Sequence, residues 1–199
     1  MKVVLATKNK DKIVEIKEIL KGLNLTFLTL YDFSDVPDAV EDGLTLKENA
    51  KKKARHCVNY TNCISIADDT GLEVDILKGE PGVCSSRFAG EDATYGDNNK
   101  KLLSLLKDIP EEKRTATFRC VAALIYPSGK EVTFEGSISG YIGYEPKGEG
   151  GFGYDPLFVV ERYGMTLAEL SSVKNRISHR AKAFLKLKRY IEKEIEIGV

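Results

Sequence analysis

The sequence lacks a net charge. Its 199 residues contain 30 lysines and arginines against 30 aspartates and glutamates, so the formal charge at pH 7 is zero. A chain without net charge has no global field to attract a polyanion such as DNA. We therefore expect no nucleic-acid partner, and any phosphate must be held by a local cluster of cations.

Cysteine and histidine are scarce. The four cysteines form no CxxC pair, and the two histidines add no regular zinc-ligand spacing. A disulfide-stapled scaffold is excluded at this length, because a hydrophobic share of 42% is enough to fill a core. We interpret the cysteines as buried or idle thiols.

Long apolar runs are also absent. The longest, such as residues 120–126, are far below the roughly 20 residues needed to cross a bilayer. The apolar residues 3–6 give way at once to the polar run 7–12, so the hydrophobic region of a signal peptide is lacking. We expect a cytoplasmic protein without membrane contact.

The first part of the chain alternates strand and helix patterns. Residues 3–6 and 25–30 predict strands on either side of a helix that ends near Gly22. Thr45 opens a second helix, and residues 64–67 predict a buried strand that ends at Asp68.

The second part changes character. Alternation on both sides of the turn at residues 127–129 predicts a long hairpin, and residues 157–160 predict a further strand. Apolar positions at helical spacing predict a last helix that carries Ala181, Phe184, Leu187, Ile191 and Ile195. The order of elements indicates an α/β protein, one domain over residues 1–199, whose sheet mixes parallel and antiparallel strands.

Residues 7–12 follow a predicted strand and open a helix. Free amides and the positive end of the helix dipole attract an anion there, and the segment adds three lysines. It is no Walker A loop, because GxxxxGK[ST] occurs nowhere in the chain. An ordinary solvated turn with surface lysines explains the pattern equally well.

Asp68 and Asp69 stand together at the predicted end of a buried strand. Paired carboxylates without a basic neighbour repel each other, and a divalent cation such as Mg²⁺ would relieve that repulsion. Glu41, in another acidic turn, is the candidate to complete the ligand set. The alternative is that the two aspartates cap a turn, with Gly71 in a left-handed conformation.

A glycine-rich loop covers residues 148–153. It matches GxGxxG, but a strand follows where a dinucleotide-binding fingerprint needs a helix, so we reject that assignment. Phe152 could lie against a planar base, with Asp155 beside it as an acceptor. A plain hairpin loop with Phe152 in a core is equally compatible with the spacing.

Lys174, His179 and Arg180 place cationic donors near the start of the last helix. There they could meet an anion or a keto oxygen. Helix-end charge pairing is the competing interpretation. Neither histidine has a serine or cysteine at an evident spacing, so a nucleophilic triad is not supported.

Five islands of sequence, in order over almost the whole chain, resemble the inosine triphosphate pyrophosphatase family. They are TxNxxK at 7–12, ADDTG at 67–71, PG with SSRF at 81–88, GGFGYDP at 150–156 and ISHR at 177–180. The resemblance implies a two-lobed α/β fold with a long central mixed β-sheet flanked by helices, a substrate cleft between the lobes, magnesium dependence and a homodimer.

Applied position by position, the resemblance implies the following roles for individual residues. Glu41 and Asp69 would bind Mg²⁺, with Asp69 also the proton acceptor. The substrate-binding residues would be Thr7, Lys8, Asn9, Lys10, Asp11, Lys12, Thr70, Phe152, Gly153, Tyr154, Asp155, Lys174, His179 and Arg180.

The implied activity is hydrolysis of noncanonical purine nucleoside triphosphates (ITP, dITP and XTP) to the monophosphate and pyrophosphate, by attack of water at the α-phosphorus. Inosine and xanthosine carry a 6-keto acceptor where adenosine carries an amino donor, so His179 and Arg180 as donors would favour the former. A phosphotransferase, a nucleotide-binding regulator and a pyrophosphatase for pyrimidine nucleotides are the competing functions.

Overall fold

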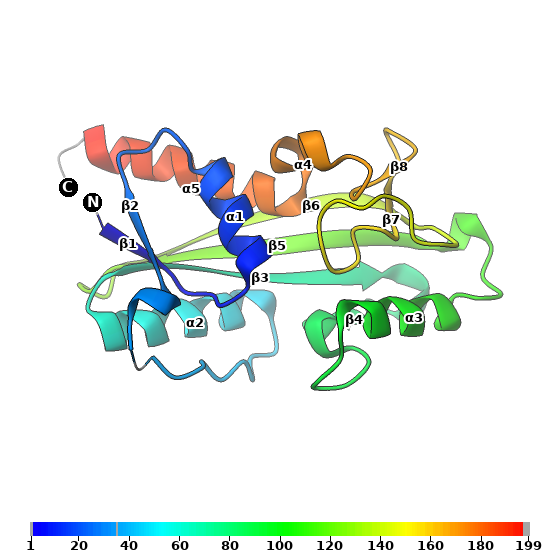
Figure 1. Cartoon of the computed structure of the whole chain (residues 1–199), viewed down its shortest axis with the longest axis horizontal. Coiled ribbons are helices and arrows are strands. Elements are labelled where there is room, and N and C mark those ends of the chain that lie inside the picture. Colours follow the sequence, from blue (N-terminus) through cyan, green and yellow to red (C-terminus); the bar gives the residue numbers. More distant parts are fainter. Residues whose placement is uncertain (1, 35, 197–199) are drawn as a thin grey trace. The chain divides into compact units, whose positions relative to one another are not determined.

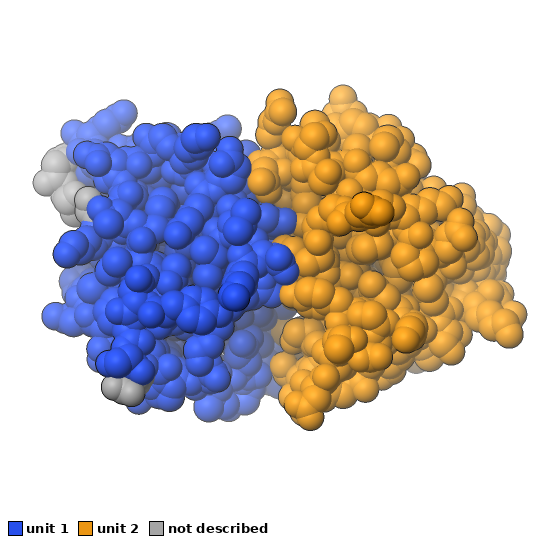
Figure 2. Space-filling model, viewed as in Figure 1, with its two compact units in different colours: residues 1–69, 120–136, 180–199 blue, residues 70–119, 137–179 orange. Residues whose placement is uncertain are grey.

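The computed structural model describes residues 2–34 and 36–196. The chain forms two compact units (Figure 2). Unit 1 takes residues 1–69, 120–136 and 180–199, and unit 2 takes residues 70–119 and 137–179. Each unit is therefore assembled from segments far apart in the sequence.

The helices and strands alternate along the chain in the expected order (Figure 1). The α-helices are α1 (Lys10–Ile19), α2 (Leu46–Thr61), α3 (Tyr95–Leu105), α4 (Ser171–Ile177) and α5 (His179–Glu196), with short 3₁₀ turns η1 (Leu30–Asp32), η2 (Asp75–Leu77), η3 (Ser85–Arg87) and η4 (Glu111–Lys113). The strands are β1 (Lys2–Leu5), β2 (Thr26–Thr29), β3 (Ile64–Val74), β4 (Pro81–Gly82), β5 (Thr115–Ile125), β6 (Glu131–Ile142), β7 (Phe158–Val160) and β8 (Met165–Thr166).

The strands follow the order β2-β1-β3-β5-β6-β7-β8, and β4 pairs with β3. β1 runs parallel to β2 and to β3, whereas the β3–β4, β6–β7 and β7–β8 pairs are antiparallel. The predicted α/β fold with a mixed central sheet flanked by helices is confirmed. None of the helices in the described parts of the chain is long and apolar enough to cross a membrane.

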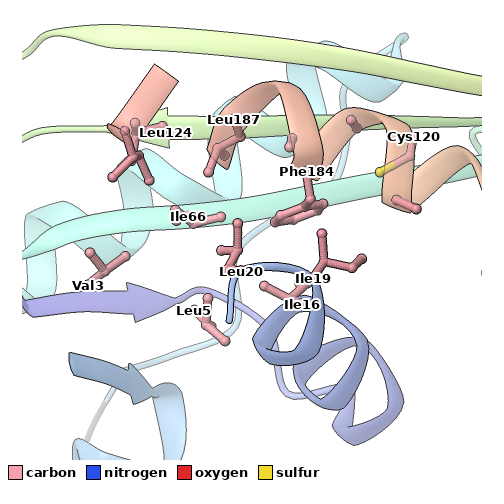
Figure 3. Close-up of a cluster of buried hydrophobic side chains, with 14 of the residues drawn as sticks. Val3, Leu5, Ile16, Ile19, Leu20, Ile66, Cys120, Leu124, Phe184 and Leu187 are labelled. Atoms are coloured by element: carbon pink, nitrogen blue, oxygen red, sulfur yellow. The ribbon is translucent and has the colours of Figure 1, made fainter. Parts of the chain in front are cut away.

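Unit 1 has a core between its strands and two helices. Figure 1 shows α1 and α5 over one face of these strands and α2 over the other. In Figure 3, Phe184 points from α5 toward the side chains of α1, and Ile66 and Cys120 lie beside them on the strands. The helical spacing of Ile13, Ile16 and Leu20 produces this buried face, because residues three or four apart share one side of a helix. The core thus fixes the start of α1 against the strands.

Unit 2 has its own core, to which α3, β5, β6 and β7 contribute. One close approach sets its geometry. A Cβ added at Gly140 of β6 would lie 2.1 Å from the carbonyl oxygen of Val159 and 3.0 Å from the ring of Phe158. Only glycine fits between these strands.

The β3 strand is longer than the sequence pattern predicts. The predicted strand ends at Asp68, but β3 continues to Val74, and Gly71 has no left-handed conformation. Both the predicted strand end and the alternative of a capped turn are therefore wrong. The polar residues stay in a buried strand because each aspartate meets cationic partners, as described below.

Smaller predictions also differ from the structure. Residues 81–82 form the short β4 instead of a plain turn, and Lys174 lies on the separate helix α4 and not at the start of the last helix. The glycine loop is followed by β7, as expected, and no helix starts there. The four cysteines, all within the described residues, form no disulfide, and Cys57 and Cys120 are buried, whereas Cys84 is exposed.

Candidate active site

Two side chains of the β1–α1 connection order the start of the helix. The Asn9 side chain accepts a hydrogen bond from the amide of Lys12 (3.0 Å), and the Thr7 hydroxyl accepts one from the amide of Asn9 (3.1 Å). Asparagine is a favoured residue at the N-cap because its oxygen satisfies an amide that the helix leaves without a partner. The segment is ordered into the geometry in which a helix N-terminus favours an anion.

The other residues of this segment are exposed. Lys10 and Asp11 lie on the outer face of α1's first turn. The Lys8 ammonium pairs with Asp38 (2.7 Å), and the Lys8 carbonyl accepts a hydrogen bond from the Tyr31 hydroxyl (2.8 Å). The segment therefore combines one inward lysine, Lys12, with an exposed rim.

Asp68 is a buried carboxylate surrounded by cations. Its Oδ2 lies 3.2 Å from Lys12 Nζ and accepts hydrogen bonds from Nε and Nη2 of Arg180 (3.3 and 3.2 Å). Burial would raise the pKa of Asp68, but the charges of Lys12, Arg180 and Lys53 outweigh it and lower that pKa below its usual value. Asp68 is therefore ionised at neutral pH.

The Arg180 guanidinium joins two elements of unit 1. Besides Asp68 of β3, it donates through Nη1 to Glu15 Oε2 of α1 at 2.6 Å, and it is 1% exposed. Burial disfavours its charge, but the two carboxylates raise the pKa of Arg180. A buried cation between two carboxylates fixes the geometry of all three side chains.

Asp69 belongs to a separate group of charges. Lys53 of α2 donates to Asp69 Oδ1 (2.7 Å) and to Glu41 Oε2 (2.9 Å). Successive side chains of a strand point to opposite faces, which explains why Asp68 meets α1 and α5 whereas Asp69 meets α2. Asp69 is 7% exposed, and burial raises its pKa, although Lys53 opposes that shift.

The two aspartates therefore do have basic neighbours, and the premise of unrelieved repulsion was wrong. Among the described residues, no group of three or more histidine, cysteine, aspartate and glutamate side chains could hold a metal ion. Glu41 and Asp69 nevertheless direct one carboxylate oxygen each at the same ammonium group, Lys53 Nζ. Carboxylate oxygens around one positive charge are the donor type that a hard divalent cation prefers.

Unit 2 holds the glycine-rich loop. Gly148, Gly151 and Gly153 all have positive φ, as a loop of this composition predicts. Asp155 is buried, and its Oδ2 accepts hydrogen bonds from the amide of Phe152 (2.8 Å) and from Lys174 Nζ (2.5 Å).

Phe152 itself is half-buried. Its ring lies 4.7 Å from the Lys174 ammonium and 5.9 Å from the ring of Tyr95. A cation beside the face of an aromatic ring is a favourable arrangement. The interpretation of Phe152 as a plain core residue is therefore incomplete, because its neighbours are a buried lysine and another aromatic ring.

The other predicted residues of unit 2 are packed in place. His179 stacks on Phe118 with ring centres 4.5 Å apart and 11° between planes, and Tyr154 donates from its hydroxyl to the Ser85 carbonyl oxygen (2.9 Å). Thr70 is the first residue of unit 2, directly after Asp69. Tyr154 thus supports the loop through an internal bond.

Comparison with known proteins gives a consistent result. The family model described as "Ham1 family" matches residues 3–190. The chain belongs to the Ham1 family. Among its relatives, the dITP/XTP pyrophosphatase of Geobacter sulfurreducens is 51% identical over 191 residues, covering 96% of each chain. That of Desulforamulus reducens is 52% identical over 187 residues, covering 94% of this chain and 93% of the relative.

Solved structures of the Ham1 family agree. A HAM1 protein from Coxiella burnetii matches with a TM-score of 0.88 at 40% identity, covering 97% of this chain and 99% of that one. The Staphylococcus aureus Ham1 protein matches with a TM-score of 0.86 at 37% identity, covering 98% and 100%. The resemblance to the pyrophosphatase family that the sequence motifs indicated is confirmed.

Within this Ham1 chain, the structure brings the predicted residues together in two groups. Glu41, Asp69 and Lys12 lie in unit 1, whereas residues 152–155 and Lys174 lie in unit 2. Lys53 is the residue that sequence reasoning missed. No local signal distinguishes it, because it is the last of three consecutive lysines at residues 51–53.

Proposed function

We propose that this chain hydrolyses noncanonical purine nucleoside triphosphates, such as ITP, dITP and XTP, to the nucleoside monophosphate and pyrophosphate. The observation that carries the proposal is the buried Asp69, held by Lys53 beside Glu41. Membership of the Ham1 family and relatives named dITP/XTP pyrophosphatase support the same activity. By this reaction the chain removes such nucleotides from the cellular pool.

Residues 7–12 bind the triphosphate. The capped start of α1 offers helix amides, and Lys12 adds a positive charge beside them. Lys12 already faces Asp68, so its ammonium is held in position before a phosphate arrives. Thr7 and Asn9 maintain the turn, while Lys8, Lys10 and Asp11 form its outer rim.

The reaction is a hydrolysis at the α-phosphorus. A water oxygen forms a bond to that phosphorus, the bond from phosphorus to the oxygen bridging toward the β-phosphate breaks, and pyrophosphate leaves with the electron pair. Asp69 orients the water and accepts its proton. Because burial raises the pKa of Asp69, its carboxylate is a stronger base than an exposed aspartate.

Glu41 and Asp69 would hold a divalent cation, Mg²⁺, through their carboxylate oxygens. When bound, the cation supplies charge neutralisation for the phosphates and lowers the pKa of bound water. Lys53 lies 2.7 Å from Asp69 and 2.9 Å from Glu41, and its ammonium group directs both carboxylates at one point. Lys12 and Lys53 add positive charge to stabilise the leaving pyrophosphate.

The base is recognised by unit 2 together with the start of α5. Phe152 lies against the purine, Gly153, Tyr154 and Asp155 shape the loop around it, and Lys174 fixes Asp155 (2.5 Å). His179 and Arg180 donate to the 6-keto oxygen, so the amino group of adenine meets an unmatched donor. Leaving such a group unpaired costs about 1–3 kcal/mol, which favours ITP over ATP by roughly ten- to hundredfold.

Three further features complete the proposal. Thr70 contacts the substrate, within a single domain over residues 1–199. The enzyme works as a homodimer, and it acts in the cytoplasm, where nucleotide pools are located. Sedimentation velocity of the purified chain tests the dimer.

A nucleotide panel tests the activity. Purified protein with MgCl₂ is incubated with ITP, XTP, dITP, GTP, ATP and TTP, and pyrophosphate and orthophosphate are measured separately. We expect pyrophosphate from ITP, dITP and XTP and little product from ATP or TTP. Orthophosphate with nucleoside diphosphate, or no turnover of any nucleotide, would contradict the proposal.

A further inference from the structure

The segment that carries Glu41 is attached to α2 in a regular order. The Leu44 amide donates to Glu48 (2.7 Å), the Gly43 amide donates to Asn49 Oδ1 (2.8 Å), Lys52 binds Asp42, and Lys53 binds Glu41 (2.9 Å). Taken in the order 44, 43, 42 and 41, the residues of the segment contact residues 48, 49, 52 and 53 of α2. We call these four contacts the α2 ladder.

One face of the helix provides the whole ladder. Glu48 and Lys52 are four residues apart, as are Asn49 and Lys53, so both pairs lie along the same side of α2. The segment has no helix or strand of its own at these positions. Its conformation therefore depends on the side chains that α2 presents to it.

Asn49 differs from the other members of the ladder in burial. It is 1% exposed, whereas Glu48 is exposed and the contact from Lys52 to Asp42 faces solvent. A buried hydrogen bond competes little with water, while exposed charge pairs contribute weakly. The Gly43–Asn49 bond is thus the firmest link of the ladder next to Glu41.

The orientation of the Asn49 side-chain amide lowers the stability of the fold. Its oxygen faces the Gly43 amide, and its buried Nδ2 has no hydrogen-bond partner in the structure. An unpaired buried donor is unfavourable for folding. An apolar residue of similar size would avoid this cost, so stability alone does not explain an asparagine here.

The lack of a side chain at Gly43 lets the segment pack closely against Asn49. A Cβ added at Gly43 would lie 2.5 Å from Asn49 Oδ1 and 2.8 Å from Glu48 Cβ. No side chain fits in that space without moving the segment away from the helix. Two residues distant in the sequence thus fix the same point of the segment.

We propose that Asn49 is a positioning residue for Glu41, which it sets against Lys53 and Asp69 by holding the Gly43 amide. The proposal rests on the role of Glu41 in metal binding given above. Asn49 touches neither substrate nor metal. Its effect on turnover passes through the position of the Glu41 carboxylate.

Amide hydrogen exchange tests the proposal without metal or nucleotide. In Asn49→Leu, which keeps the number and branching of the side-chain heavy atoms and loses the acceptor, peptides covering residues 41–45 should exchange at least about tenfold faster, because a hydrogen-bonded amide becomes available to solvent. Asn49→Asp keeps the acceptor and should stay near the original rate. The control Lys52→Ala removes only an exposed contact and should change exchange by less than about threefold. Unchanged exchange in Asn49→Leu would overturn the proposal.

Metal titration supplies the functional readout. The MgCl₂ concentration for half-maximal ITP turnover should rise roughly tenfold to a hundredfold in Asn49→Leu, the size expected when a group supporting a metal ligand is lost. Turnover at saturating MgCl₂ should stay within about threefold of the original, since Asp69 is intact. An equal loss at every MgCl₂ concentration, with exchange at residues 41–45 unchanged, would show a general structural defect instead.

Gly43→Ala approaches the same contact from the segment and remains informative if Asn49→Leu fails to fold. It should raise exchange at residues 41–45 and the MgCl₂ requirement in the same direction, and an unaltered MgCl₂ requirement would contradict the proposal. If the original chain hydrolyses no nucleotide, the proposed function fails, yet the exchange experiment still decides whether Asn49 fixes the segment.

Discussion

The two units place different chemistry at their candidate sites. Unit 1 gathers formal charges: Lys12, Arg180 and Lys53 face the carboxylates of β3. Unit 2 sets aromatic rings beside a single buried ion pair, that of Lys174 and Asp155. The difference matches the roles proposed above, because a triphosphate needs charge and a purine needs a flat surface. Changes at Asp69 should therefore affect the chemical step, changes at Lys174 should affect stability, and changes at Arg180 should affect base choice.

Asp69→Asn should have the largest effect, a loss of turnover. The amide is nearly the same size but accepts no proton, so kcat for ITP should fall roughly 10²–10⁴-fold. The KM should change much less, since residues 7–12 and the base loop stay intact. Steady-state assays of pyrophosphate release measure both constants. Turnover near that of the original chain would remove Asp69 from the mechanism.

Asp68→Asn is the matched control for that experiment. Asp68 is adjacent in sequence but engages Lys12 and Arg180 on the opposite face. Its replacement leaves two buried cations short of a carboxylate, so we expect the free energy of unfolding to fall by more than in Asp69→Asn. If the two variants behave alike, the separation of roles between neighbouring carboxylates is wrong.

The next largest effect concerns stability in unit 2. Lys174→Met leaves the Asp155 carboxylate buried without its cation and should lower the free energy of unfolding by about 3–5 kcal/mol. The double variant Lys174→Met/Asp155→Asn removes the stranded charge and should regain part of the loss. Denaturant unfolding measures both. If the double variant loses more free energy of unfolding than the two single variants lose together, this account is contradicted.

Base choice should respond to Arg180. In Arg180→Ala, the ratio of kcat/KM for ITP over ATP should fall roughly tenfold to hundredfold, because the unmatched donor facing adenine is removed. The control Glu15→Gln weakens the ion pair that holds Arg180 (2.6 Å) but keeps the guanidinium, and should retain most of the preference. An unchanged preference in Arg180→Ala would show that selectivity comes from elsewhere.

A smaller effect should be visible in the pH dependence. Burial raises the pKa of Asp69, so its carboxylate is protonated at a higher pH than an exposed aspartate and ceases to act as a base there. The acidic limb of log kcat/KM should therefore have its midpoint above 3.8. Lys53 opposes the shift, so Lys53→Gln should move the midpoint further up. A midpoint at or below the ordinary value would contradict the assignment.

The two aspartates also predict opposite effects of pH on folding. The lowered pKa of Asp68 adds stability above its unfolded value of 3.8, and this is lost as the pH falls toward its folded pKa. The raised pKa of Asp69 has the reverse sign, since acid favours the folded state until the pH falls below 3.8. Unfolding of Asp68→Asn and Asp69→Asn between pH 3 and pH 7 separates these contributions.

Much of this fold was predictable from the sequence. The alternation around residues 127–129 and the helical spacing of Ile13, Ile16 and Leu20 are local patterns, and each gave the correct element. The end of β3 was misplaced because the two aspartates were taken as incompatible with a buried strand. The cations that make them compatible come from Lys12, 56 residues before Asp68, and Arg180, 112 residues after it, and no local pattern reports such pairing.

The candidate site was predictable to a similar degree. The motifs identified the family and supplied the candidate residues, but not the partners of these residues. Lys53 lies in the helix run 51–53, where three lysines look alike in sequence. Only the contacts show that Lys51 binds Glu131, Lys52 binds Asp42 and Lys53 binds Asp69. Which lysine faces the site depends on how α2 is rotated against the strands.

The close approach of β7 to Gly140 limits which substitutions position 140 can accept. One added methyl group there would meet the backbone of β7, and β7 begins three residues after Asp155. A lineage could therefore preserve every charged and aromatic residue discussed above and still lose base recognition through an alanine in β6. Mutational scans of this chain should find position 140 as intolerant as many positions in the site itself.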